Sequence, residues 1–253
     1  MFVFLLTWIA VPAKATLMSE IYLIRHGQAS FGDEDYDRLS AVGIRQSQVL
    51  ADHLFAQDVR FDAVYSGPLK RQQDTARAFC ERFGTRQAAL RKPVVLEAFT
   101  EYDAGSLLAA RTLLGRDAKG RSTDELDRVR QDKRAFQTYF ADTVDRWLAG
   151  TFDNAGVETW SSFCKRVLQG VRRITSDNGN GRRVAVFTSG GPICAVLKEA
   201  LDLSGKSAIE LSWQTMNASV SCVKYKGDRL ALAFFNNTTH LLLAQDPALL
   251  TYR

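Results

Sequence analysis

The chain has 253 residues, of which 46% are hydrophobic and 24% are charged, and its 33 Lys and Arg against 28 Asp and Glu give a formal net charge of +5. This composition is typical of a soluble globular protein and excludes a disordered chain, a fibre or a repeat array. The basic residues are interleaved with acidic ones rather than clustered, so we expect no nucleic-acid partner.

Residues 1–17 resemble a leader or a signal peptide. Their apolar run, residues 2–11, is too short to span a bilayer, so we expect no stable membrane insertion. Ala13-Lys14-Ala15 resembles a cleavage site, but no Lys or Arg precedes the apolar run, and Met18 stands directly before a strand-like segment. We therefore expect translation from Met18 and a cytoplasmic protein. Export is the alternative, if residues 1–15 act as a signal peptide.

Beyond residue 18, short apolar runs alternate with segments of helical periodicity, which is typical of strands covered by helices. We expect strands at residues 21–24, 61–65, 184–188, 220–225 and 230–235. We also expect three amphipathic helices, each with a set of residues on its buried face. The first follows a Ser40 cap and carries Ile44, Ser47, Ala51 and Leu54 on that face. The other two carry Leu69, Ala76, Phe79 and Phe83, and Trp160, Phe163, Val167, Val171 and Ile174. The predicted fold of residues 18–253 is an α/β class, three-layer α/β/α sandwich with a mainly parallel mixed sheet.

Residues 106–150 differ from the rest of the chain because they contain many charged residues and show helical periodicity. We interpret them as a helical lid insertion rather than as an independent domain. The arginines of this segment alternate with acidic residues, which favours a solvated charged surface. Recognition of an anionic substrate tail is the alternative.

Two segments carry candidate chemistry, and each follows a predicted strand, where α/β folds place their sites. Arg25-His26-Gly27 offers a guanidinium fork for phosphate, an imidazole and a glycine that allows a sharp turn. The second segment, residues 66–71, ends in Arg71 on the first turn of a helix, where backbone amides also favour an anion.

These segments resemble the histidine phosphatase superfamily, the phosphoglycerate mutase-like proteins. The resemblance extends in order over residues 21–201 through the stretches 23–28, 39–46, 68–76 and 187–191. It implies that His26 attacks a phosphoryl group and becomes transiently phosphorylated, a role that a neutral imidazole can fill without losing a proton. It also implies that Arg25 and Arg71 clamp the phosphoryl oxygens, with Gly27, Gln28, Ser189 and Gly190 binding substrate.

The leaving alkoxide needs a proton, and three carboxylic acids could supply it. The resemblance implies Glu101, within residues 99–105, as general acid and later general base. Glu97 and Asp103 remain alternatives, because neither spacing nor polarity separates the three.

The resemblance breaks at Ser189, where the family carries a second catalytic histidine. Serine retains a hydroxyl donor but has no charge and a shorter reach, so turnover is expected to be weak. Two other histidines exist. His53 lies within a predicted helix, whereas His240 follows the last predicted strand and could approach the pocket, or could simply start a capped helix.

The sequence therefore predicts a metal-independent phosphomonoesterase that acts through a phosphohistidine on a small phosphorylated substrate and needs no cofactor. The alternatives are a phosphate-ester or phosphopeptide binding protein with little turnover and a phosphoglycerate mutase-like phosphotransferase. The four cysteines are far apart without a CxxC pair, which predicts buried free thiols rather than a metal site or disulfides. The sequence leaves the oligomeric state open.

Overall fold

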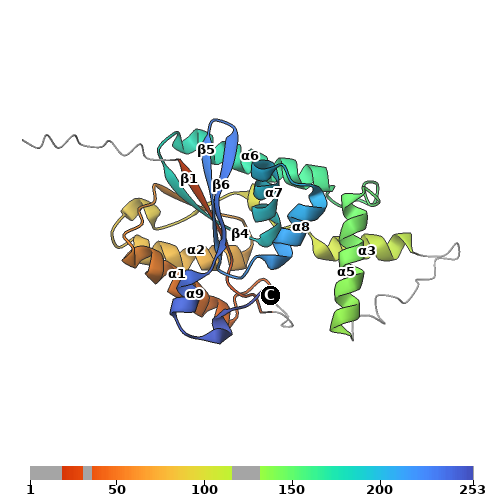
Figure 1. Cartoon of the computed structure of the whole chain (residues 1–253), viewed down its shortest axis with the longest axis horizontal. Coiled ribbons are helices and arrows are strands. Elements are labelled where there is room, and N and C mark those ends of the chain that lie inside the picture. The colour runs from red at the N-terminus through yellow and green to blue at the C-terminus, as the bar shows by residue number, and fades with distance from the viewer. Residues whose placement is uncertain (1–18, 31–35, 116–131, 253) are drawn as a thin grey trace, which may run out of the picture.

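The computed structural model describes residues 19–30, 36–115 and 132–252, so the leader-like segment 1–17 and part of the predicted lid lie outside the described residues. A six-stranded sheet with the order β3-β2-β4-β1-β5-β6 forms the centre of the molecule (Figure 1). Its strands are β1 (Glu20–Arg25), β2 (Ala63–Ser66), β3 (Val94–Val95), β4 (Arg183–Thr188), β5 (Val220–Lys226) and β6 (Arg229–Asn237).

Strand β1 lies between a parallel and an antiparallel neighbour. It runs parallel to β4, with Arg25 opposite Thr188, and antiparallel to β5. Strands β2, β3 and β4 are also parallel to one another, whereas β5 and β6 pair antiparallel. The carboxyl ends of β1 and β4 therefore meet at one edge of the sheet, and the prediction of a mainly parallel mixed sheet is confirmed.

Helices cover both faces of the sheet, as a three-layer sandwich requires (Figure 1). Side chains alternate along β1: Ile24 packs with α1 and α2, whereas Ile21 and Leu23 pack with α6 and α7. The helices that form the two layers are α1 (Ala41–Ala56) and α2 (Lys70–Phe83) on one face, and α6 (Trp160–Asn178), α7 (Gly190–Leu201) and α8 (Gly205–Gln214) on the other. Shorter elements are α9 (Thr239–Leu243) and 3-10 turns at Ala88–Leu90, Glu97–Phe99 and Pro247–Leu249.

The predicted helix after Ser40 is present, but one of its predicted core residues is not buried. Ser40 caps α1 by accepting a hydrogen bond from the amide of Gly43, at 3.1 Å. Ser47, Ala51 and Leu54 are buried, whereas Ile44 is 50% exposed. The buried stripe instead includes Gln46 and Leu50, so it lies to one side of the face that periodicity indicated.

Within the predicted lid, α3 (Ala104–Leu114) and α5 (Lys133–Leu148) pack against each other and project at one end of the molecule (Figure 1). The Arg111 guanidinium joins the two helices by donating to the Tyr139 carbonyl at 2.7 Å and by pairing with Asp142 at 2.8 Å. At the base of α5, Val144 and Trp147 are buried in the same core cluster as α6. Residues 116–131 of the predicted lid lie outside the described residues.

The four cysteines are free thiols, as expected: Cys80, Cys194 and Cys222 are buried and Cys164 is partly buried. Burial raises the pKa of the three buried thiols to about 12, so they are protonated. In the part of the chain that the structure describes, no helix is long and apolar enough to cross a membrane.

Candidate active site

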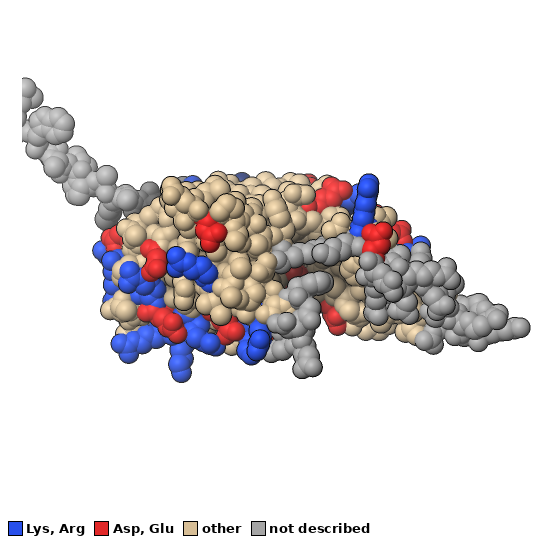
Figure 2. All heavy atoms as spheres, turned by 90° about the horizontal axis from the view of Figure 1, so that it is seen from below, with Lys and Arg blue, Asp and Glu red and all other residues tan. Residues whose placement is uncertain are grey.

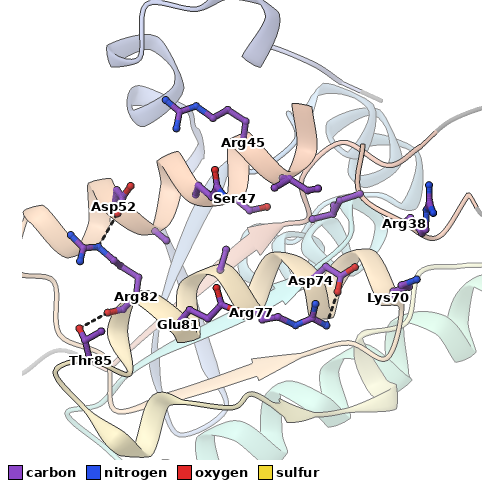
Figure 3. Close-up of a pocket in the computed structure, with 15 residues that line it drawn as sticks. Arg38, Arg45, Ser47, Asp52, Lys70, Asp74, Arg77, Glu81, Arg82 and Thr85 are labelled. Atoms are coloured by element: carbon purple, nitrogen blue, oxygen red, sulfur yellow. Dashed lines mark hydrogen bonds and ion pairs between the residues drawn. The ribbon is translucent and has the colours of Figure 1, made fainter. Parts of the chain in front are cut away.

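A hollow of about 840 Å³ lies between α1 and α2, away from the predicted site residues. Figure 3 shows two ion pairs among its charged side chains: Arg82 binds Asp52 and Arg77 binds Asp74, both at 2.8 Å. Figure 2 shows basic and acidic side chains interspersed at this end of the molecule. None of His26, Arg25 and Glu101 lines this groove.

His26 lies at the carboxyl end of β1 and is held by its own backbone. Its amide donates to the Thr188 carbonyl at 2.8 Å, and its carbonyl accepts from the amide of Ala218 at 3.1 Å and from the Asn217 side chain at 3.3 Å. The side chain is only 5% exposed. The nucleophile predicted from the motif therefore has a fixed position between β4 and the segment before β5.

Hydrogen bonds to the imidazole identify its tautomer. Nδ1 lies 2.7 Å from the Gly27 carbonyl, to which it can only donate, while Nε2 accepts a hydrogen bond from Arg71 Nε at 3.1 Å. Burial, followed by the positive charges of Arg71 and Arg25, lowers the pKa of His26 well below its usual value. The ring is therefore neutral near pH 7, with the lone pair of Nε2 directed at a guanidinium.

Arg71 is fixed by an acid that the sequence did not point to. Its Nη1 binds Asp37 at 2.6 Å, and the same carboxylate accepts from the amide of Lys70 at 2.7 Å. Asp37 thus occupies the amino end of α2, where sequence reasoning placed a bound anion. The helix amides there bind a resident carboxylate, and the guanidinium of Arg71 is the group that faces His26.

Gly27 is required by close packing of two backbones. A Cβ atom at this position would lie 2.4 Å from the Gly43 carbonyl oxygen, which is inside van der Waals contact. The Gly27 amide donates to Thr75 Oγ1 at 3.0 Å, and that hydroxyl donates to the Arg71 carbonyl at 2.8 Å. Thr75 therefore connects the turn after His26 to the helix that carries Arg71.

Gln28 joins this turn to α1 and, through Gln46, to the end of the chain. Its side-chain oxygen accepts from the Ser40 hydroxyl at 2.8 Å, and its amide donates to Gln46 Oε1 at 2.8 Å. Gln46 Nε2 in turn donates to the Leu249 carbonyl at 2.7 Å and to Thr251 Oγ1 at 2.9 Å. The structure thus gives Gln28 a supporting position around the predicted site.

Arg25 points toward the same cavity as Glu101. One guanidinium nitrogen donates to the Thr215 carbonyl, while Nε is buried with no hydrogen-bond partner in the structure. Burial lowers the pKa of Arg25, and the nearby Glu101 partly offsets this effect. A buried N–H donor without a partner is costly, and an anion bound beside it would satisfy it.

Of the three candidate acids, Glu101 has the environment that a general acid needs. Its two oxygens accept hydrogen bonds from the amides of Tyr102 and Gly191, both at 3.1 Å. Burial raises its pKa despite these bonds and despite the neighbouring arginines. Glu97 is exposed, and Asp103 caps α3 through Ser106, whose hydrogen bonds lower the pKa of that carboxyl.

Ser189 is the N-cap residue of α7, directly after Thr188, whose carbonyl binds the His26 amide, and it is fully buried. Its Oγ accepts a hydrogen bond from Gln72 Nε2 at 2.8 Å, and the same amide nitrogen donates to the Phe99 carbonyl at 3.1 Å. Gln72, which is also fully buried and which sequence reasoning missed, therefore packs directly against Ser189. Gly190 follows Ser189 and lines the cavity with Gly191.

The remaining histidines pack against each other on the α1 side. The rings of His53 and His240 are 5.9 Å apart, and His240 is 3% exposed. Burial, followed by the charge of His53, lowers the pKa of His240 to about 4. Neither ring lines the cavity beside Arg25 and Glu101, and His240 lies in α9, the capped-helix alternative stated for it.

A cavity of about 320 Å³ opens beside Arg25, Glu101, Gly190 and Gly191. Its other walls carry aromatic side chains that no motif had indicated, among them Tyr102, Phe136, Phe140 and Trp213. Phe136 and Phe140 had only the signal of large apolar residues in a segment of helical period, Tyr102 lies within the segment 99–105, and Trp213, on α8, had no sequence signal. Among the described residues, no group of three or more His, Cys, Asp or Glu is arranged to hold a metal ion.

His26 at the end of a parallel strand, two arginines and the shielded Glu101 are the kinds of group that a phosphoryl-binding site on an α/β fold requires. The model of the histidine phosphatase superfamily (branch 1) matches residues 21–238, and the chain belongs to this superfamily. No curated protein sequence matches the chain.

Several solved structures share this fold at low sequence identity. Phosphoserine phosphatase from Entamoeba histolytica is 22% identical with a TM-score of 0.59, over 88% of this chain and 100% of that one. Mycobacterial glucosyl-3-phosphoglycerate phosphatase is 19% identical with a TM-score of 0.58, over 87% and 99%. Phosphoglycerate mutase from Bacillus anthracis is 17% identical with a TM-score of 0.61, over 91% and 98%. At these identities the likeness concerns the fold.

Proposed function

We propose that the protein is a phosphomonoesterase that acts through a phosphohistidine at His26. The observation that carries this proposal is the tautomer of the ring: Nδ1 is fixed as a donor by Gly27, so Nε2 presents its lone pair beside Arg71. A neutral imidazole held this way is a competent nucleophile, and its low pKa keeps it neutral at physiological pH.

In the first step, the Nε2–P bond forms as the ester P–O bond breaks. The alcohol oxygen leaves with the electron pair of that bond and takes a proton from Glu101, whose raised pKa favours the protonated acid. Arg25 and Arg71 stabilise the charge on the phosphoryl oxygens. In the second step, Glu101 accepts a proton from water as the water attacks phosphorus, releasing inorganic phosphate and neutral His26. No metal ion takes part.

Ser189 replaces the family's second histidine in this proposal. Its oxygen accepts a hydrogen bond from Gln72, which leaves the hydroxyl proton to be donated toward the phosphoryl group. A neutral hydroxyl stabilises developing negative charge less than an imidazolium, so we expect turnover to be slow. By analogy with the loss of one oxyanion-hole donor, the deficit is on the order of 10²-fold.

Small phosphorylated molecules fit the cavity of about 320 Å³, and the structural neighbours are named for phosphoserine, glucosyl-3-phosphoglycerate and phosphoglycerate. A mutase shares the first step and differs only in the acceptor of the phosphoryl group. Hydrolysis and transfer are separated by measuring released inorganic phosphate against phosphoryl transfer to an added alcohol.

The experiment that tests the proposal is turnover of para-nitrophenyl phosphate combined with trapping of the labelled enzyme. We expect release of nitrophenol, incorporation of acid-labile, alkali-stable phosphate, and loss of both in His26→Ala. Turnover that survives His26→Ala contradicts the mechanism.

Binding of phosphate esters without turnover would instead identify the second candidate, a phosphate-ester or phosphopeptide binding protein. The serine at position 189 is the observation that favours this candidate.

A further inference from the structure

The cavity beside Glu101 has a polar end and a largely apolar wall. Its volume of about 320 Å³ is near the lower limit of about 300 Å³ for small-ligand sites. Arg25 and Glu101 mark the polar end. The apolar wall is built by side chains from α3, α5, α8 and the segment before α3, namely Leu108, Phe136, Phe140, Trp213 and Tyr102.

The aromatic wall is rigid where it approaches Glu101. The ring of Tyr102 packs on Trp147 at 5.2 Å and on Phe163 at 5.9 Å, both in the core. The Trp213 side chain donates a hydrogen bond to the Tyr102 hydroxyl, which orients the indole over the cavity. Trp213 nevertheless remains 37% exposed. An aromatic side chain that is held in place yet accessible offers a flat apolar surface on which a ligand ring can pack.

The same wall offers no counter-charge for a second anionic group. Among the described residues that line the cavity, Arg25 is the one cation and Glu101 the one acid. Arg111, one turn beyond Leu108 on α3, is directed to α5 by its bonds to Tyr139 and Asp142. Within this described lining, a carboxylate on the alcohol part of a substrate would therefore lose water next to Glu101 and gain no cation beyond Arg25.

We propose that the natural substrates are phosphate monoesters of uncharged aromatic alcohols, with the phosphoryl group between His26 and the two arginines and the ring against Trp213 and Phe140. This inference rests on the proposed function and specifies its substrate class. The site thereby discriminates against carboxylated esters such as phosphoglycerate, for which two of the structural neighbours are named.

Aryl esters are also better substrates than alkyl esters for a site that carries serine at position 189. The phosphorus–oxygen bond breaks as Nε2 of His26 bonds to phosphorus, and the aryl oxygen leaves with the bonding pair and the proton of Glu101. A phenol has a pKa of about 10, far below that of an alkyl alcohol, so an aryl oxide leaves readily. A site that lacks a second charged donor therefore retains more activity on aryl esters than on alkyl esters.

The test compares phenyl phosphate with 4-carboxyphenyl phosphate as substrates of the wild-type chain. We expect kcat/KM to be at least about tenfold higher for phenyl phosphate, because the carboxylate loses hydration without a partner. The carboxyl group makes the phenol a better leaving group, so intrinsic reactivity opposes the expected order. Equal or higher kcat/KM for the carboxylated ester overturns the inference.

A cation placed on the wall should reverse this preference. Leu108→Arg is expected to reduce the ratio of the two kcat/KM values by about tenfold by pairing with the carboxylate. Leu114→Arg adds the same charge on the same helix at a position that is 58% exposed and outside the cavity, and should leave the ratio unchanged. An equal effect of both variants shows that net charge alone sets the ratio and overturns the inference.

Binding separates failure of this inference from failure of the proposed function, and it does not depend on the variants folding. Phenylphosphonate and 4-carboxyphenylphosphonate have an uncleavable P–C bond, and their affinities for the wild-type chain are measured by calorimetry. Tighter binding of phenylphosphonate supports the aromatic site even if no ester is hydrolysed, in which case only the phosphatase proposal fails. Tighter binding of the carboxylated analogue, or no binding of either, overturns the substrate class.

Discussion

Ser189→His should introduce a working imidazole donor only if Gln72 is shortened at the same time. Ser189 Oγ and Gln72 Nε2 are 2.8 Å apart, and both residues are fully buried. An imidazole that follows the direction of the serine side chain would overlap the glutamine amide. The prediction therefore concerns a pair of substitutions rather than a single gain of function.

The magnitudes follow from packing and from donor strength. Overpacking a buried site costs about 1–3 kcal/mol, so Ser189→His alone should lower the free energy of unfolding by that amount. Gln72→Ala leaves the Leu69 amide, now bonded to Gln72 Oε1 at 3.2 Å, without its partner and also destabilises. The double variant should lose less unfolding free energy than the two single variants together, and the difference, the coupling energy, should be about 1–2 kcal/mol.

Turnover gives the second readout. The double variant places an imidazole donor next to His26, and we expect kcat for para-nitrophenyl phosphate to rise on the order of 10²-fold above wild type. Urea denaturation of the wild type, both single variants and the double variant gives the coupling energy, and steady-state kinetics gives the gain. If Ser189→His alone is as stable as wild type and as active as the double variant, Gln72 does not fill the space of the second histidine.

Three further outcomes are expected. Because burial raises the pKa of Glu101, kcat/KM should fall as pH rises through that raised pKa, and Glu101→Gln should lower kcat/KM and remove this alkaline limb of the profile. Asp37→Ala should lower kcat/KM about tenfold by releasing the arginine beside His26 and should cost about 1 kcal/mol as a lost cap, whereas Asp52→Ala, which removes a 64% exposed acid on α1, should change neither; equal effects would contradict the positioning role. Thr75→Val should lower the free energy of unfolding by about 1–3 kcal/mol in chemical denaturation, because the buried Gly27 amide loses its acceptor, and an unchanged midpoint would contradict this.

The sequence predicted the frame of the site because its signals are local. His26 and Arg71 each follow a strand that an apolar run identifies, and parallel strands bring their carboxyl ends to one edge. Helical periodicity likewise located α1, α2 and α6. It did not identify α8, whose buried residues Ala208, Ile209 and Ser212 form too weak an apolar stripe.

What the sequence could not supply is which polar side chains meet across the fold. Gln72 and Ser189 are 117 positions apart, and nothing in either local pattern indicates that they share a hydrogen bond. Likewise, nothing in the sequence around Asp37 indicates that its carboxylate pairs with Arg71. The exposure of Ile44 has a similar cause, since a periodic face does not specify how far a neighbouring helix covers it.

The hydrogen bonds that connect Gln46 with Leu249 and Thr251 have a consequence for substitutions at Thr251. Thr251 also pairs with Asn217, which contacts the backbone of His26, and the neighbouring Tyr252 borders the cavity. A substitution at Thr251 would therefore reach the backbone of His26 through two hydrogen bonds, although the two residues are far apart in the sequence.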